Sequence, residues 1–157
     1  MFHRSTCLTV LLAPLLGLGT ALAQSAPVTN SYDLIVTDQK TVNACSSGEP
    51  VSLNGVMHFS YSVSTDSSGV NHFSVTVANN LTGVGQNTGT YYVASDSDNY
   101  SSNNDDTSAD LTVELKSDLK SQGSAPGMTL VQSLHIVVDT SGNISAQVVS
   151  NTTGCGS

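Results

Sequence analysis

Hydrophobic and polar residues alternate along most of this chain. Between Val51 and Val63 the odd positions are mainly apolar, whereas His58, Ser60 and Ser62 occupy even positions. The same alternation returns in four later stretches, at 71–77, 110–116, 128–138 and 144–148. A period of two predicts β-strands that bury one face, and no window after residue 23 has a convincing helical period. The sequence therefore predicts an all-β fold.

Two turns of one type connect these runs. The segments 65–71 (TDSSGVN) and 138–144 (VDTSGNI) each contain an aspartate, two small polar residues and a glycine. This order predicts a three-residue hairpin loop, in which a type I turn ends with glycine in the left-handed region. In that register Val63 lies beside Phe73 and Val138 beside Ile144, so that the apolar faces of each hairpin coincide.

The second turn also invites a catalytic interpretation. Asp139 and Thr140, followed closely by Gly142, resemble the catalytic turn of aspartic proteases. That turn requires glycine directly after the Asp-Thr pair, where this chain has Ser141, and it requires a partner aspartate from a second lobe. We therefore expect a hairpin here and not a reaction centre.

The pattern predicts one antiparallel β-domain of about seven strands, arranged as a small closed barrel or a twisted sandwich. The run from 51 to 63 is longer than a usual strand, so we expect a bend, and Gly55 is the natural position for it. The core is expected to comprise the inward-facing apolar residues Met57, Phe59, Tyr61, Val63, Phe73, Val75, Val77, Leu111, Val113, Leu115, Leu134, Ile136 and Val148.

The N-terminal 23 residues have the composition of a secretory signal peptide. Arg4 provides a positive start, residues 8–22 are almost wholly apolar, and Ala21 and Ala23 are small residues at the positions that a signal peptidase reads. The apolar run is too short to span a bilayer comfortably. We expect residues 1–23 to be cleaved, residues 24–157 to form a single exported β-domain in the periplasm or outside the cell, and the mature chain to lack a membrane span.

Cleavage would remove the only arginine and leave an acidic domain. Three lysines (Lys40, Lys116 and Lys120) then face twelve acidic residues, a net charge of −9. Such a surface repels nucleic acid and anionic lipid headgroups. Without arginine there is also no bidentate fork for phosphate or carboxylate ligands. We expect no nucleic-acid partner.

Two cysteines remain after cleavage, Cys45 and Cys155. An even pair in an exported chain indicates a disulfide. It would join the first third of the mature chain to its last residues, and the chain-entropy model assigns so long a loop about 4–5 kcal/mol. Two free thiols, or a metal site built from two cysteines without a nearby histidine, are poorer interpretations.

The histidines and the acidic tract are candidates for metal binding. His58, His72 and His135 occupy the polar side of their strands, but the predicted hairpin places His58 and His72 six residues apart along the sheet, roughly 20 Å. The segment 95–110 is rich in Asp, Ser and Asn, yet it does not follow the spacing of an EF-type calcium loop. We expect surface histidines and a mobile acidic loop, no metal site and no cofactor, with weak calcium binding by the loop as the alternative.

Other catalytic patterns are also incomplete. Gly83, Gly85 and Gly89 precede a strand and not the helix that a dinucleotide loop requires, so they predict a bend or a close backbone approach. The chain has no Gly-x-Ser-x-Gly elbow. Its two glutamates, Glu49 and Glu114, have no evident reason to lie together as a sugar-hydrolysing pair. We assign no catalytic residue.

The segment 43–58 resembles a motif of small secreted bacterial β-proteins that have no characterised activity. The matching residues are Asn43, Cys45, Gly48, Glu49, Val51, Leu53, Gly55 and His58. The likeness continues in Gly69 and His72, in Gly83, Val84, Gly85, Thr88, Gly89 and Tyr91, in 134–149, and in Cys155. The resemblance implies a bacterial, exported β-domain and supports the Cys45–Cys155 bridge, but it implies no activity.

The sequence favours a non-catalytic exported module that binds a ligand or acts at the cell surface. The mouth of a closed barrel would offer a site for a small apolar molecule, and a cell-surface partner is the other expectation. One alternative is a structural or adhesive surface subunit with an unpaired edge strand. A less favoured one is a β-barrel enzyme, which requires a cavity that holds a titratable group with a perturbed pKa.

Overall fold

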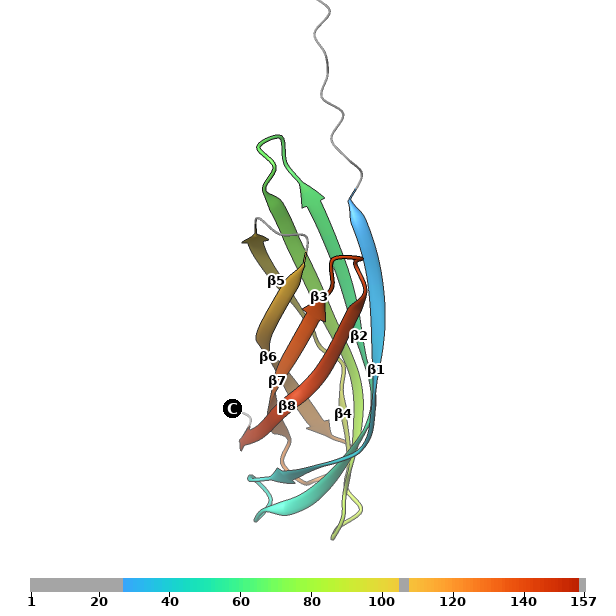
Figure 1. Cartoon of the computed structure of the whole chain (residues 1–157). Helices are drawn as coiled ribbons and strands as arrows, with labels where there is room; N and C mark the ends of the chain where they lie inside the picture. Colours follow the sequence, from blue (N-terminus) through green and yellow to red (C-terminus); the bar gives the residue numbers. More distant parts are fainter. Residues whose placement is uncertain (1–26, 105–107, 156–157) are drawn as a thin grey trace, which may run out of the picture.

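The computed structural model describes residues 27–104 and 108–155, and within these ranges it is all-β with eight antiparallel strands (Figure 1). This confirms the predicted fold class. The strands are β1 Val28–Asn43, β2 Glu49–Thr65, β3 Asn71–Gly85, β4 Tyr91–Ala94, β5 Ser97–Asn104, β6 Ala109–Ser121, β7 Met128–Val138 and β8 Ile144–Cys155.

The strands form one sheet that curls into a nearly closed barrel. The order is β1-β2-β3-β4-β6-β7-β8, and β5 pairs with the part of β3 that β4 leaves uncovered. The β7–β8 turn lies next to β1, as Figure 1 shows, and Asn30 Nδ2 of β1 donates to Gly142 O of that turn at 2.8 Å. No backbone ladder joins the described parts of β1 and β8. The barrel is therefore closed at this seam by side chains.

The two long hairpins have the predicted register. Val63 pairs with Phe73, and Val138 pairs with Ile144. In both loops the backbone N–H of the glycine donates to the carbonyl of the aspartate, at 3.1 Å in the first and 2.9 Å in the second, and both glycines have positive φ. The Asp139 turn is thus a hairpin loop, as predicted.

The inward-facing apolar side chains fill the barrel. Those nearly inaccessible to solvent include Leu53, Met57, Phe59, Phe73, Val75, Val77, Leu81, Tyr92, Leu115, Leu119, Leu130, Leu134 and Ile136. Three members of the predicted core, Leu111, Val113 and Val148, are only half-buried. The first two face inward on β6, in the portion that no neighbouring strand covers on the β5 side.

The acidic segment 95–110 differs from the mobile loop that the sequence predicted. Residues 97–104 form β5, β6 begins at Ala109, and residues 105–107 lie outside the described residues. β5 brings the number of strands to eight in the described part of the chain. It lacks an apolar alternation, and its outward-facing Asn99 bonds to β3: Asn99 Nδ2 donates to Thr76 Oγ1 at 2.8 Å. Its inward-facing Tyr100 packs against the core.

Gly55 lies in β2 where this strand pairs with both β1 and β3, and the backbone geometry there requires glycine. It pairs with Val36 on one side and Leu81 on the other, next to an irregularity in β1 between Val36 and Gln39. Its φ is 150°, which side chains rarely allow, and a Cβ on it would lie 2.1 Å from the carbonyl oxygen of Asn80. At this φ a Cβ would point toward β3 instead of to a face of the sheet, so only glycine fits.

We predict that Gly55→Ala destabilises the protein by about 3 kcal/mol or more, because strain and overlap add. Gly154→Ala is the matched control, since Gly154 is also in a strand and a Cβ there meets no atom within 4 Å. Urea denaturation followed by circular dichroism measures both. Equal stability of the two variants would contradict this account of β2.

Candidate functional site

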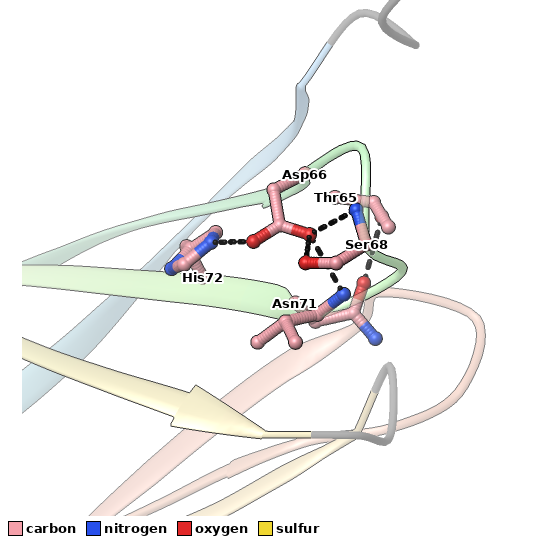
Figure 2. Close-up of polar contacts among 6 residues, drawn as sticks. Thr65, Asp66, Ser68, Asn71 and His72 are labelled. Carbon is pink, nitrogen blue, oxygen red and sulfur yellow. Dashed lines mark hydrogen bonds and ion pairs between the residues drawn. The ribbon is translucent and has the colours of Figure 1, made fainter.

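A carboxylate shapes the turn between β2 and β3 and pairs with a histidine (Figure 2). Asp66 Oδ1 accepts hydrogen bonds from the backbone N–H of Ser68 at 2.8 Å, the hydroxyl of Ser68 at 2.7 Å and the N–H of Val70 at 3.0 Å. Its Oδ2 lies 3.0 Å from Nε2 of His72. The Ser68 hydroxyl, followed by His72 and the Val70 N–H, holds the pKa of Asp66 well below its usual range. The side chain therefore remains ionised.

The other two histidines of the described residues have the same kind of partner. His58 Nδ1 lies 2.5 Å from Asp33 Oδ1 across the β1–β2 pair. His135 Nε2 lies 2.7 Å from Oδ1 of Asp110. In the part of the chain that the structure describes, no three His, Cys, Asp or Glu side chains gather as a metal site would require. Each histidine thus belongs to a separate surface pair.

Small hydroxyl residues lie between two of these pairs on the outer face of β1, β2 and β3. One row across the strands is Thr29–Ser62–Ser74, and the next is Ser31–Ser60–Thr76. Successive outward positions along a strand lie roughly 6.6 Å apart and neighbouring strands about 4.8 Å apart, so the rows form a lattice of hydroxyl groups. The chemistry is that of an uncharged surface that both donates and accepts hydrogen bonds.

These rows form the floor of a groove of about 510 Å³, which we call the hydroxyl groove. It is lined by Thr29, Asn30, Ser31, Ser60, Tyr61, Ser62, Ser74 and Thr76. The tyrosine side chain points into the barrel and is 2% exposed, so the groove surface comes from the short polar residues.

Longer side chains bound the hydroxyl groove. On one side, the next outward position of β2 after Ser60 is His58, which pairs with Asp33 across β1 and β2. On the other side, the next outward position of β3 after Ser74 is His72, which pairs with Asp66. Asn99 of β5 bonds to Thr76 at the far side. The groove exists because serine and threonine are shorter than the residues that surround them.

The sequence showed these serines and threonines as the polar half of the alternation, but not as a site. The missing information was the register, because the rows combine residues from three strands. The pattern Ser-x-Ser-x-Ser at 60–64, together with Ser74 and Thr76 in the next strand, was the available signal.

Several residues of the 43–58 segment form a cluster of polar contacts near the disulfide. Glu49 is buried, and its Oε1 accepts hydrogen bonds from the backbone N–H of Thr88 at 2.8 Å and from the Thr88 hydroxyl at 2.7 Å. These bonds lower the pKa of Glu49, and the bond from the Thr88 hydroxyl has the largest effect. A Cβ on Gly85 would lie 2.5 Å from Oε1, so glycine makes the space for the carboxylate. The glycine-rich segment thus makes the predicted close approach, and a strand, β4, follows it.

The predicted disulfide Cys45–Cys155 is present, with Cα atoms 5.2 Å apart. Asn43, fully buried, orients its surroundings: its Oδ1 accepts from the N–H of Cys45 at 2.9 Å, and its Nδ2 donates to Tyr92 Oη and to Pro126 O. The bridge and these bonds join the β1–β2 turn to the end of β8 and to β4. Glu114 lies on β6 far along the chain from this cluster, and no interaction joins the two glutamates.

One further groove contains a carboxyl group with an altered pKa. Asp96, between β4 and β5, lines a groove of about 240 Å³ together with Asp118 and Lys120. Burial raises the pKa of Asp96, and its Oδ2 is closed off from solvent without a hydrogen-bond partner. A perturbed acid in a cavity is the minimum that the enzyme alternative requires.

Comparison with known proteins adds no relative: no family model, no curated protein and no solved structure matches the chain. Over the described residues, no helix is long and apolar enough to cross a membrane.

We predict that replacing both cysteines (Cys45→Ser with Cys155→Ser) lowers the free energy of unfolding by about 4 kcal/mol, because the bridge closes a loop of 110 residues in the unfolded chain. Urea denaturation of the parent with and without dithiothreitol should give the same difference. A variant as stable as the oxidised parent would mean that side-chain contacts alone hold the seam.

We predict that Asp96→Asn stabilises the protein by about 1 kcal/mol at pH 7, because it removes a half-buried carboxylate whose ionised form is disfavoured by loss of solvent. The pKa of Asp96 is raised in the folded state, so ionised Asp96 lowers the free energy of unfolding once the pH rises above its pKa in the unfolded chain. The extra stability of the Asp96→Asn variant should therefore vanish near pH 3, where the carboxyl group is protonated in both states. Thermal unfolding across this range measures it. Glu114→Gln, which removes an exposed charge, controls for the lower net charge.

Proposed function

We propose that this protein is an exported, non-catalytic binding module, and that the hydroxyl groove on the outer face of β1, β2 and β3 is its binding surface. The observation that carries the proposal is the composition of that groove: every residue that lines it is uncharged, although the mature chain has a net charge of −9. The signal-like start supports export, and the disulfide is compatible with an oxidising compartment.

The interior favours a site on the outside. The inward-facing side chains of β2, β3 and β7 are buried against one another, and the grooves on the outside are lined largely by polar residues. The expected small apolar ligand in the barrel mouth remains a prediction, and a polar ligand on the outer face has the more direct support.

The chemistry of the groove indicates the class of ligand. The hydroxyl side chains of Thr29, Ser31, Ser60 and Ser62 make no hydrogen bond to another described residue, so they are available to a ligand. A volume of about 510 Å³ suits a small molecule or part of a chain. An uncharged ligand rich in hydroxyl groups, such as a neutral oligosaccharide, complements these groups. No aromatic ring lies on the floor, so we expect weak, hydrogen-bond-dominated binding.

Titration with neutral oligosaccharides built from glucose, mannose, galactose or xylose tests the proposal. We expect at least one to shift the amide NMR resonances of residues 60–62 and 74–76 at millimolar concentration. Ser62→Arg, which fills the groove, should weaken that binding at least tenfold, whereas Thr112→Arg, an exposed position on β6, should not.

Absence of shifts with every neutral chain, or equal shifts in both arginine variants, would overturn the proposal. A stronger response to acidic oligosaccharides would overturn the assignment of an uncharged ligand.

A structural or adhesive subunit is the second candidate, because one specific observation favours it. The facing edges of β5 and β6 are unpaired in the described residues, and unpaired edges are the feature that the adhesive alternative predicted.

A further inference from the structure

A second surface, separate from the hydroxyl groove, lies between β5 and β6. These two strands are consecutive in sequence but do not pair with each other. Among the described strands, β5 forms a ladder only with β3. β6 pairs with β4 through Tyr92–Ser121 and Val93–Lys120, and with β7 along its length. No backbone pair joins the described parts of β5 and β6. We call the gap between the two strands the β5–β6 seam.

One side chain of β5 reaches across the seam. Tyr100 of β5 donates from its hydroxyl to the backbone carbonyl of Glu114 on β6 at 2.6 Å. Strands in a ladder lie about 4.8 Å apart. A connection that needs the length of a tyrosine side chain therefore indicates that the two edges are farther apart than paired strands.

The burial of β6 changes along this seam. At its β4-paired end, Leu115 and Leu119 face inward and are at most 1% exposed. At its unpaired end, Leu111 and Val113 also face inward but are only half-buried. Both ends have the same partner strand β7, so the difference arises on the β5 side, where β6 has no ladder partner among the described residues.

The charge around the seam is acidic. Asp98 of β5 and Glu114 of β6 lie close enough to the Tyr100 hydroxyl to raise its pKa, after the larger effect of burial. Asp110 lies farther along the same edge of β6 and is 74% exposed, and Lys116 is the cation next to Glu114 on the outer face of β6. An occupant that carries basic side chains would complement these carboxylates.

We propose that the β5–β6 seam binds an extended, lysine- or arginine-containing segment of another protein by strand addition. The main-chain groups of the two unpaired edges would bond to the backbone of the segment, its apolar side chains would cover Leu111 and Val113, and its basic side chains would lie on the outer face beside Asp110 and Glu114. A second copy of this chain is a poor occupant because the mature chain carries three lysines against twelve acidic residues, so that copies repel.

The test uses the oxidised protein and a synthetic, N-acetylated peptide of alternating lysine and valine. We expect saturable binding by isothermal titration calorimetry, together with slower hydrogen exchange of the amides in 98–101 and 110–114. Two further peptides separate the contributions. One has glutamate in place of lysine, and the other has N-methyl groups on alternate residues, which remove ladder donors and keep the charge.

Both control peptides should bind at least tenfold more weakly than the parent peptide. Glu114→Lys should weaken binding of the parent peptide at least tenfold, whereas Asp33→Lys, a similarly exposed carboxylate on β1, should change it less than twofold. Equal binding of the N-methylated peptide, or protection of amides elsewhere, would overturn strand addition. Concentration-dependent dimers that protect the same amides would overturn the assignment to a basic partner.

The results of the peptide experiment do not test the hydroxyl groove, because the groove is tested with different variants and with oligosaccharides. Binding of neutral oligosaccharides can fail while the basic peptide binds, and the reverse.

Discussion

The structure depends on a barrel seam that is closed without a backbone ladder. β1 and β8 are the two ends of the sheet, and their facing edges form no strand pair in the described residues. At one end Asn30 bonds to the carbonyl of Gly142, and at the other the Thr153 hydroxyl bonds to the carbonyl of Val42 next to the Cys45–Cys155 bridge. Because ladder bonds are missing there, these contacts join the two ends of the sheet, while the shared core packs β2 and β3 against β6 and β7. The disulfide adds a covalent bond at one end of this seam.

Two buried polar residues, Asn43 and Glu49, support this closure. Asn43 joins the disulfide turn to β4, and Glu49 holds the β3–β4 turn through Thr88. Gly85 provides the space for the carboxylate. Residues that a motif search would single out as functional are therefore used to hold one end of the barrel together. Binding is then assigned to surfaces whose side chains lack such structural tasks, namely the outer face of β1 to β3 and the β5–β6 seam.

Local chemistry explains why part of the structure could be predicted from sequence. The alternation and the Asp-x-x-Gly turns fix face and register within a hairpin, so Val63 beside Phe73 was predictable, and the even number of exported cysteines indicated the bridge. β5 was not predictable because Ser and Asn give no hydrophobic signal and its stability comes from β3. The groove required the pairing of three strands, and the altered pKa of Asp96 depends on burial by residues distant in sequence.

The two proposed binding surfaces share one strand. Successive residues of a strand face opposite sides, so in β5 Asn99 faces outward and bonds to Thr76 at the margin of the hydroxyl groove, while Tyr100 faces inward and bridges the seam to Glu114. A segment that pairs with β5 in the seam would fix the position of Asn99 as well. Because neutral hydrogen bonds respond little to salt and a basic segment on acidic edges responds strongly, ionic strength separates the two kinds of binding even though they act on neighbouring residues of the same strand.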